Sequence, residues 1–455
     1  MTTASARFAD HARTTRWSDL PETARTMART FLHDSLAVGV AGAAIPMSDA
    51  VLRAASGWGS TPQAASVLGR GTLPLTAGNA AFVNAFQIHA QEYDAVHEAA
   101  VVHPMATVVA VLLAEAGRGT PVTGADLLTA LSVGVDVATG LGLAATTALK
   151  FFRPATAGIF GCVAALVSLR QLDRDMALDA FGLALAFAGG TMQAHVEGLA
   201  TLPVQIAAAA RGAIEAVDLA QAGVPGPRGA IDGPFGYLAL FEDGADLAPV
   251  LASLGVIHRV TEVSWKPFPT GRAAHGAIVA TATLRAQGLS ADDLDQLVYA
   301  APPLIARLVG RPAHDAMTPA YARLCFPYLA AVVLRRGAVG LADFTEERLR
   351  DPATLALAAR VRVERDGNPD PAAFVPAVAT ATLRDGSQRE ARITAQLGSP
   401  ANPLTAAQHL AKAQGCLDFA GLGAAHAPLA ELMAHFEHVP DAAAAISAVL
   451  RPPTR

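Results

Sequence analysis

The sequence predicts a mainly α-helical protein, in which a large all-helical domain formed by both chain ends carries a smaller α+β lid domain. Three observations support this fold class. Apolar residues recur at helical spacing from Leu20 to Gln221. Segments typical of β-strands appear only between about residues 267 and 400. The helical pattern returns after Asn402-Pro403, so we expect the C-terminal segment to pack on the first domain.

Length and composition agree with two domains. A chain of 455 residues is too long for one ordinary core. We assign residues 1–266, completed by 404–455, to the helical domain and residues 267–403 to the lid. Hydrophobic residues make up 52% and charged residues only 16%. Charge is therefore sparse for the surface of a monomer of this size, and we expect an oligomer.

Helix start and stop signals are clear in the first half of the chain. Pro104 opens an apolar run that ends at Gly117, and proline at the first helical position with glycine after the last is the favoured pattern. His103 therefore occupies the N-cap position of this predicted helix. Thr123 followed by Asp126 resembles a capping box ahead of a helix over 127–137.

The second half alternates strands and helices. Strands are predicted at 297–301 and 360–365, and helices at 273–287 and 321–335. Residues 378–383 and 388–395 flank Asp385-Gly386, which predicts a hairpin with a type I′ turn. This mixture indicates a small α+β domain.

The composition excludes several classes of partner. The net charge is −5 and there is no run of lysine and arginine, so we expect no nucleic-acid partner. No apolar run reaches the ~18 residues that a membrane span needs, and residues 1–10 lack the apolar region of a signal peptide. These features predict a cytoplasmic protein. Three separated cysteines, at 162, 325 and 416, favour buried thiols over a disulfide or zinc framework.

The stretch from His89 to His103 concentrates three histidines and three carboxylates within fifteen residues. His103 lies at a helix N-terminus, where the helix dipole disfavours a protonated ring. A neutral imidazole can act as a general base, or the residue is simply a helix cap. Asp94 could orient that ring or carry a proton, and His97 could be a second proton carrier or a polar loop residue. His89 could contact substrate, or form hydrogen bonds within the fold.

The remaining two carboxylates of this stretch, Glu92 and Glu98, are expected to face solvent. His195 and Glu197 lie close together further along the chain and could supply additional polar groups.

A second group of candidates lies at the predicted domain junction. Lys266, one of only three lysines, stands in Trp-Lys-Pro-Phe-Pro and could hold a substrate carboxylate. Arg272 suits a bidentate carboxylate clamp, because its planar guanidinium matches two oxygens. His275 lies three residues further, on the same helical face, and could supply an acid. The structural alternatives are a surface lysine and an ion pair at a helix start.

Several of these segments, in this order, resemble the MmgE/PrpD family. The resembling segments are Phe31–Gly42, Asn84–Pro104, Asp126–Asp136, Ser264-Trp-Lys-Pro-Phe-Pro with Arg272 and His275, Ala322–Tyr328, and Gly398-Ser-Pro-Ala-Asn-Pro-Leu-Thr. The resemblance implies a helical domain built from both chain ends, a smaller lid and a homodimer with its active site between the domains. It also implies no metal and no organic cofactor, and it places Tyr328 near the cleft.

The chain departs from the family pattern in three segments. Arg153-Pro154-Ala155 stands where relatives usually carry His-Pro-Thr, and Leu202 where they usually carry lysine. Ala95 replaces the second aspartate of an Asp-Asp pair. Arg153 cannot act as a base, because it keeps its proton, but it could bind an extra carboxylate. Leu202 and Ala155 predict a substrate with fewer carboxylates or a larger apolar group.

Together these features predict a cofactor-independent lyase, a dehydratase or decarboxylase, that abstracts a proton next to a carboxylate of a small polycarboxylic acid. The predicted catalytic residues are Asp94, His97, His103, Lys266 and His275. The predicted substrate-binding residues are Arg272, Arg153, Tyr328 and His89. An epimerase or isomerase of a dicarboxylate, and a catalytically impaired relative that only binds a metabolite, are the alternatives.

Overall fold

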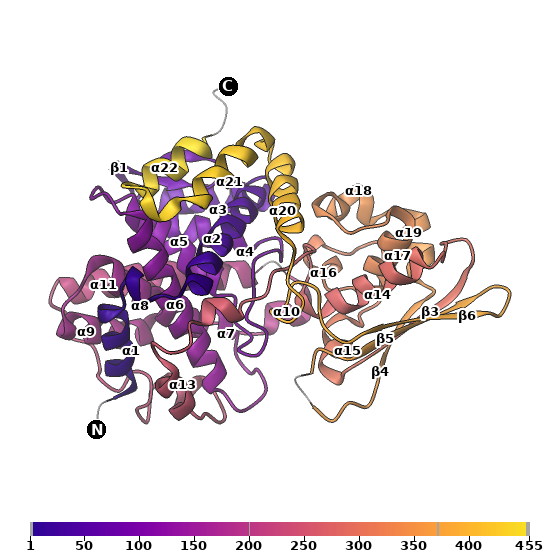
Figure 1. The fold of residues 1–455 in the computed structure, drawn as a ribbon, viewed down its shortest axis with the longest axis horizontal. Helices are drawn as coiled ribbons and strands as arrows, with labels where there is room; N and C mark the ends of the chain where they lie inside the picture. The colour runs from indigo at the N-terminus through magenta and orange to yellow at the C-terminus, as the bar shows by residue number, and fades with distance from the viewer. Residues whose placement is uncertain (1–2, 200, 371–372, 452–455) are drawn as a thin grey trace.

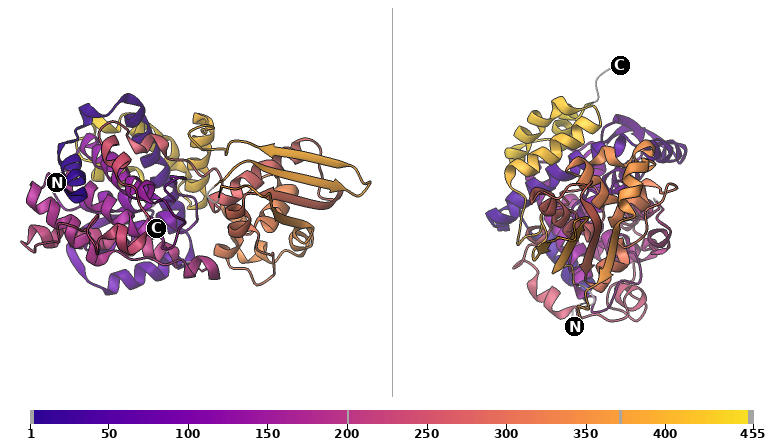
Figure 2. Two further views of the ribbon diagram at one scale, coloured as in Figure 1. Left: turned by 90° about the horizontal axis from the view of Figure 1, so that it is seen from below. Right: turned by 90° about the vertical axis from the view of Figure 1, so that its right-hand side faces the viewer.

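The computed structural model describes residues 3–199, 201–370 and 373–451. Its buried apolar residues form two large cores. The first, in the helical half, runs from Ala4 to Trp265 and resumes from Leu404 to Leu450. The second, in the sheet half, draws on residues from Ala273 to Ile393. The two halves are visible as a larger and a smaller lobe (Figures 1 and 2). The mainly α fold with a smaller α+β region is confirmed.

Helices make up almost all of the helical half. They are α1 (Ala4–Thr14), α2 (Glu22–Ala43), α3 (Pro46–Gly57), α4 (Ala77–His89), α5 (Pro104–Ala116), α6 (Gly124–Ala144), α7 (Arg153–Thr156), α8 (Gly158–Arg170), α9 (Arg174–Phe187), α10 (Gln193–Glu197), α11 (Leu202–Gln221), α12 (Tyr237–Phe241), α13 (Ala248–Ser253), α20 (Ala406–Phe419), α21 (His426–Ala434) and α22 (Ala442–Val449). The last three come from the C-terminal segment, and α20 packs on α2. In Figure 1, α20 lies at the boundary with the sheet half.

The sheet half is a four-stranded sheet with helices packed against it. Its helices are α14 (His275–Ala286), α15 (Pro303–Val309), α16 (Pro319–Ala322), α17 (Phe326–Arg336), α18 (Glu346–Leu349) and α19 (Pro352–Ala358). Its strands are β3 (Leu294–Ala301), β4 (Val361–Arg365), β5 (Ala377–Leu383) and β6 (Gln388–Ile393). The strand order is β4-β3-β5-β6, and only the β3–β4 pair is parallel. Alternate residues of β5 are buried, because α14 packs on one face of the sheet.

The capping signals in the sequence predict the helix starts correctly. Helix α5 begins at Pro104 with His103 at the N-cap, and Gly117 follows its last residue. Helix α6 has Thr123 at its N-cap, and the Thr123 hydroxyl accepts a hydrogen bond from the Asp126 N–H at 3.1 Å. His103 makes no capping hydrogen bond with its side chain, which leaves its ring available for other contacts.

Two local predictions are wrong. The β5–β6 hairpin forms, but its turn is not type I′, because only Gly386 and not Asp385 has a positive φ. Instead the Gly386 N–H donates to the Leu383 carbonyl, and the left-handed glycine returns the chain to β6. The helical half also contains an antiparallel pair, β1 (Ser60–Val67) and β2 (Gly71–Leu75), where the sequence pattern predicts helix.

Helix α6 is long and apolar enough, by length and composition, to cross a membrane. The sequence pattern does not predict a segment of this kind. In the structure, 94% of its most apolar window is buried inside the protein. Core helices of large helical domains have the same composition. We therefore interpret α6 as the central core helix of the helical half. The three cysteines are buried and unpaired, as expected.

Candidate active site between the two halves

The site is built on the loop that joins α4 to α5. His89 is the last residue of α4 and His103 caps α5, so both ends of the loop are fixed by helices. Val96 exchanges two backbone hydrogen bonds with Ser264, at 3.0 and 2.8 Å. This short bridge places the segment that carries Lys266 beside the loop that carries Asp94. Residues distant in the sequence therefore meet here through two backbone hydrogen bonds.

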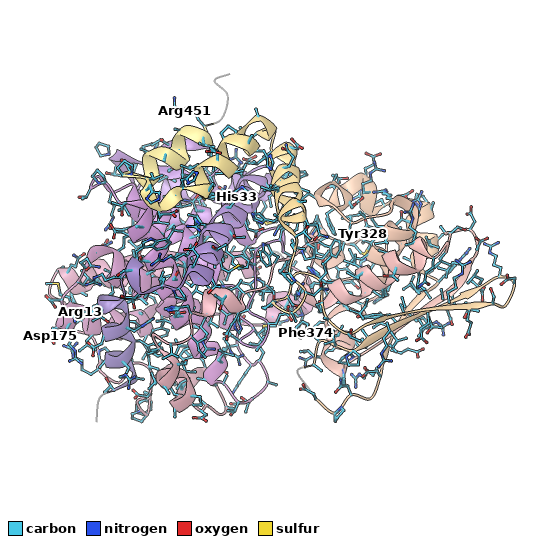
Figure 3. The ribbon with its side chains drawn as sticks, in the orientation of Figure 1. Arg13, His33, Asp175, Tyr328, Phe374 and Arg451 are labelled. Atoms are coloured by element: carbon cyan, nitrogen blue, oxygen red, sulfur yellow. The ribbon has the colours of Figure 1, made fainter. Side chains whose placement is uncertain are left out.

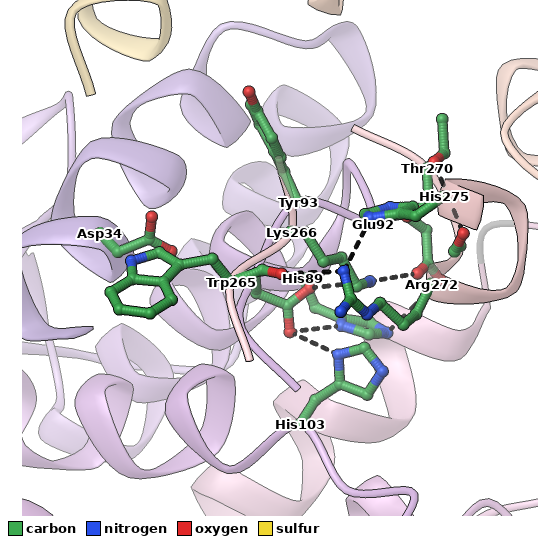
Figure 4. A network of polar contacts seen from close by, with 12 residues as sticks. Asp34, His89, Glu92, Tyr93, His103, Trp265, Lys266, Thr270, Arg272 and His275 are labelled. Carbon is green, nitrogen blue, oxygen red and sulfur yellow. Dashed lines mark hydrogen bonds and ion pairs between the residues drawn. The ribbon is translucent and has the colours of Figure 1, made fainter. Parts of the chain in front are cut away.

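Asp94 is the centre of the site. It is fully buried, and its Oδ2 lies 3.0 Å from Nδ1 of His89 and 3.0 Å from Nδ1 of His103. The two rings are nearly perpendicular, with centroids 4.8 Å apart. Burial alone would raise the pKa of Asp94, but the two histidines and Lys266 outweigh it and hold that pKa well below its ordinary value. Asp94 is therefore an ionised acceptor for both rings. Figure 4 shows His89 and His103 near Lys266 and Arg272.

The two histidines that share Asp94 have opposite protonation tendencies. Burial opposes the charged form of His89, but the charge and hydrogen bond of Asp94 outweigh it and raise the pKa of His89. Burial lowers the pKa of His103, and the nearby charge of Lys266 adds to this effect against the opposing effect of Asp94. His103 is thus the neutral ring. With its Nδ1 bound to Asp94, its Nε2 carries the free lone pair.

Lys266 is fully buried next to Glu92 and Asp94. Its Nζ lies 2.8 Å from Oε2 of Glu92 and 3.8 Å from Oδ1 of Asp94. Burial would raise the pKa of Glu92, but the charges of Lys266, His89 and His103 together lower it to about 2. Glu92 adopts a left-handed backbone conformation, with φ of 52°, that directs the loop around Lys266. The cation therefore holds two carboxylates in their ionised form.

Arg272 forms the neighbouring ion pair. Its Nε donates to Oε1 of Glu98 at 2.8 Å, and its Nη1 donates to the Leu397 carbonyl at 2.7 Å and to Nδ1 of His275 at 3.1 Å. His275 uses its other nitrogen to donate to the Thr270 carbonyl at 3.2 Å. Burial and the charge of Arg272 hold the pKa of His275 well below its ordinary value. A neutral His275 thus positions the guanidinium.

A cavity of about 130 Å³ adjoins these groups. Its polar walls come from His89, Glu92, Glu98, His103, His195 and Arg272. Its apolar walls come from both halves of the chain: Val96, Val101, Leu149, Phe152, Pro154, Met192, Leu202, Leu308, Leu324 and Phe374. Phe374 lies at the boundary of the two halves in Figure 3. A smaller hollow of about 30 Å³ shares His89, Glu92, His195, Leu202 and Leu324 with it.

The predicted site residues fall into three groups. His89, His103 and Arg272 line the cavity, and Asp94, Lys266 and His275 contact these residues or Glu92 from behind. His97, Arg153 and Tyr328 do not line it.

His97 points away from the cavity: its Nε2 lies 3.2 Å from Oε2 of Glu262, and its Nδ1 accepts a hydrogen bond from the Ala100 N–H. Tyr328 is fully buried in the core of the sheet half, and its hydroxyl donates to the Asp343 carbonyl. The structure therefore gives both side chains partners within the fold.

Two carboxylates expected at the surface instead line the cavity. Glu92 and Glu98 have side chains only 20% and 22% exposed, each paired with a buried cation. The expectation that they face solvent is wrong, because the loop wraps around Lys266 and Arg272. Arg323, which the sequence analysis did not single out, lines the smaller hollow. No signal in the sequence identifies these two carboxylates, because the burial of their cation partners is known only from the structure.

Ligand atoms of His89, Asp94 and His103 lie within 4.8 Å of one another and could in principle hold a metal ion. However, both Nδ1 atoms point at the same oxygen of Asp94, at hydrogen-bond distance. The group is therefore arranged as a hydrogen-bonded His-Asp-His set. The absence of a metal requirement stays a prediction: dialysis against a chelator should leave any turnover unchanged.

Both halves of the chain match domains of one family. The MmgE/PrpD N-terminal domain matches residues 6–250, and the MmgE/PrpD C-terminal domain matches residues 268–427. The chain belongs to the MmgE/PrpD family. Among its relatives is a cis-aconitate decarboxylase of Homo sapiens, 29% identical over 66% of this chain and 64% of that protein. A cis-aconitate decarboxylase of Mus musculus is 27% identical over 82% of this chain and 78% of that protein. The cis-aconitate decarboxylase-like protein oryM of Aspergillus oryzae is 29% identical over 75% of each chain.

The residues at which this MmgE/PrpD protein departs from the family pattern have different environments in the structure. Arg153 forms a bidentate ion pair with Glu242, with both N–O distances 2.8 Å, and donates to the Ala100 carbonyl. It is buried and serves the packing of the helical half. Leu202 instead lines both the cavity and the smaller hollow, so an apolar side chain faces this space. Ala95 is fully buried.

Proposed function

We propose that this protein is a cofactor-independent lyase that transfers a proton at a carbon next to a carboxylate of a small organic acid and releases water or carbon dioxide. The relatives named cis-aconitate decarboxylase support this reaction class. The observation that carries the proposal is the neutral His103, held by Asp94 at the wall of a cavity between the two halves.

His103 is the proposed general base. Its Nδ1–H donates to Asp94, which fixes the tautomer and leaves the Nε2 lone pair for a substrate proton. When the ring takes that proton, the ionised Asp94 stabilises the imidazolium. In a dehydration, the protonated ring can then return the proton to the departing hydroxyl. In a decarboxylation, loss of carbon dioxide itself leaves the carbanion, so no C–H proton is taken first, and a His103 ring protonated from solvent donates its proton to that carbanion. One residue thus supplies both a base and an acid.

Charge that develops on the substrate carboxylate requires fixed positive groups nearby. Arg272 lies at the cavity wall and is oriented by His275 and the Leu397 carbonyl. Lys266 does not line the cavity, so we propose that it acts through Glu92 and Asp94, which it keeps ionised. One well-placed donor to a developing anion contributes about 3 kcal/mol to the transition state.

Proton exchange in heavy water tests this proposal. The protein is incubated with a panel of citrates, malates and their alkyl derivatives, and NMR follows deuterium uptake and product formation. Elimination or decarboxylation supports the lyase. Deuterium uptake without a product would replace it with an isomerase or epimerase. A rise in melting temperature with neither exchange nor product would replace it with a metabolite-binding protein.

A further inference from the structure

Arg323 is a buried cation without a carboxylate partner. It follows α16 in the sheet half and is only 5% exposed. Its Nη2 donates to Oε1 of Gln91 at 3.2 Å, and its guanidinium carbon lies 4.3 Å from the ring centroid of Phe344. Its Nε is buried and has no hydrogen-bond partner among the described residues. Burial lowers the pKa of Arg323 to about 10, which leaves it charged at neutral pH.

The other buried arginines of the described chain differ in this respect. Arg153 is neutralised by Glu242, and Arg272 by Glu98. A buried guanidinium without a counter-ion is costly, so such groups are normally paired. The missing partner of Arg323 therefore points to an anion that comes from outside the chain.

The hollow beside Arg323 has the size and donors for one carboxylate. It holds about 30 Å³ and opens toward the main cavity, because both share His89 and Leu202 as walls. Nε2 of His89 is a second buried nitrogen without a hydrogen-bond partner, and Nε2 of Gln91 is a third. Of these three residues, Arg323 and His89 line the hollow and Gln91 does not. The Glu92 carboxylate is also part of its wall, with Oε1 3.9 Å from Nε2 of His89.

We infer that Arg323 and His89 bind one carboxylate of the substrate in this hollow, which places the adjacent carbon beside His103. This inference rests on the proposed function and specifies its substrate class. His89 and His103 have ring centroids 4.8 Å apart, so one or two bonds separate a carboxylate at His89 from a C–H at His103.

The rest of the substrate lies in the apolar main cavity. Glu92 and Glu98 neutralise Lys266 and Arg272, whereas no carboxylate of the described residues forms an ion pair with Arg323. Additional substrate carboxylates would face these two glutamates and the apolar walls near Leu202. The substrate is therefore a mono- or dicarboxylic acid with an apolar body, and tricarboxylic acids bind weakly.

Calorimetric titration with butanoate, 2-methylsuccinate and citrate tests the inference. The wild-type protein should bind the first two acids more tightly than citrate. Arg323→Met should weaken their binding at least tenfold, and Arg323→Lys should weaken it less. The matched control is Arg311→Met, since Arg311 lies over Tyr321 but does not line either cavity. His103→Asn should retain binding, because its ring is proposed to act on a proton.

The outcomes separate this inference from the proposed lyase. Unchanged binding in Arg323→Met, tighter binding of citrate, or no binding of any acid would each overturn the carboxylate site. If Arg323→Met fails to fold, a loss of binding in Arg311→Met as large as the loss in Arg323→Lys would do the same. Binding that depends on Arg323, without proton exchange by the wild type, would keep the carboxylate site and refute the lyase.

Discussion

Replacement of Lys266 by methionine removes a fully buried charge from between two carboxylates. Methionine keeps a similar length but no ammonium, so Glu92 and Asp94 lose the cation that lies 2.8 and 3.8 Å away. Loss of one partner of a buried ion pair costs about 3–5 kcal/mol of unfolding free energy. The lowered pKa of Glu92 gives a second estimate of the free energy that the charges around this carboxylate contribute, of which the Lys266 charge is the largest. A pKa of about 2, against the ordinary 4.5, corresponds to about 3 kcal/mol of unfolding free energy at neutral pH. This contribution is lost as the pH falls toward 2 and Glu92 becomes protonated.

Urea denaturation followed by tryptophan fluorescence measures this loss. All three tryptophans, at positions 17, 58 and 265, lie in the helical half, so the signal reports the half that contains the site. Glu92→Gln in the Lys266→Met background should restore about 2 kcal/mol, because it removes one of the stranded carboxylates. Lys150→Met is the matched control, since Lys150 forms an exposed pair with Asp243 and should cost less than about 1 kcal/mol.

The reasoning is refuted if Lys266→Met costs no more than Lys150→Met, or if the glutamine replacement adds to the damage. Either result would mean that Glu92 and Lys266 do not form a buried pair in solution.

Three further predictions follow from the charges. Turnover should fall as the pH drops through the pKa of the base, with a midpoint below 6.5, because burial and the Lys266 charge lower the pKa of His103; a midpoint above 7 in a pH–rate profile would contradict this. Burial lowers the pKa values of His33 and His409 to about 4. As the pH falls, these two histidines therefore become protonated in the unfolded chain before they do so in the folded protein, and the free energy of unfolding decreases below pH 6.5. Urea denaturation should show that the free energy of unfolding is lower by about 2 kcal/mol per histidine at pH 5, and this loss should be absent when both histidines are replaced by asparagine. Arg153→Met should cost about 3–5 kcal/mol of stability but leave turnover per folded molecule unchanged, and a normal stability with lost turnover would place Arg153 in the site after all.

Local signals in the sequence predict the structure where local interactions decide it. Pro104 and Gly117 predict the limits of α5, and with them the N-cap position of His103. The β1–β2 pair is different, because a distant side chain stabilises it. Asn84 in α4 accepts a hydrogen bond from the Leu68 N–H and donates to the Ser66 carbonyl. No pattern within the strands records that contact.

In the site, too, some contacts could be predicted from the sequence and others could not. The hypothesis that Asp94 orients the ring of His103 agrees with the 3.0 Å between its Oδ2 and Nδ1 of that ring. For His97 the sequence left two alternatives, a proton carrier and a polar loop residue, and the loop turns this ring toward Glu262, 165 residues later. The carboxylates that pair with Lys266 and Arg272 could not be read from the sequence, because any acid of the loop could have filled that role.

The central claim is that His103, and not its neighbour His97, transfers a proton to and from a bound acid. Deuterium exchange measured by NMR on the most active acid of the panel tests it, with His103→Asn and His97→Asn compared at equal folded concentration. The account predicts at least a hundredfold loss for His103→Asn and less than a threefold change for His97→Asn. Equal losses in the two variants, or exchange that persists in His103→Asn, would contradict it.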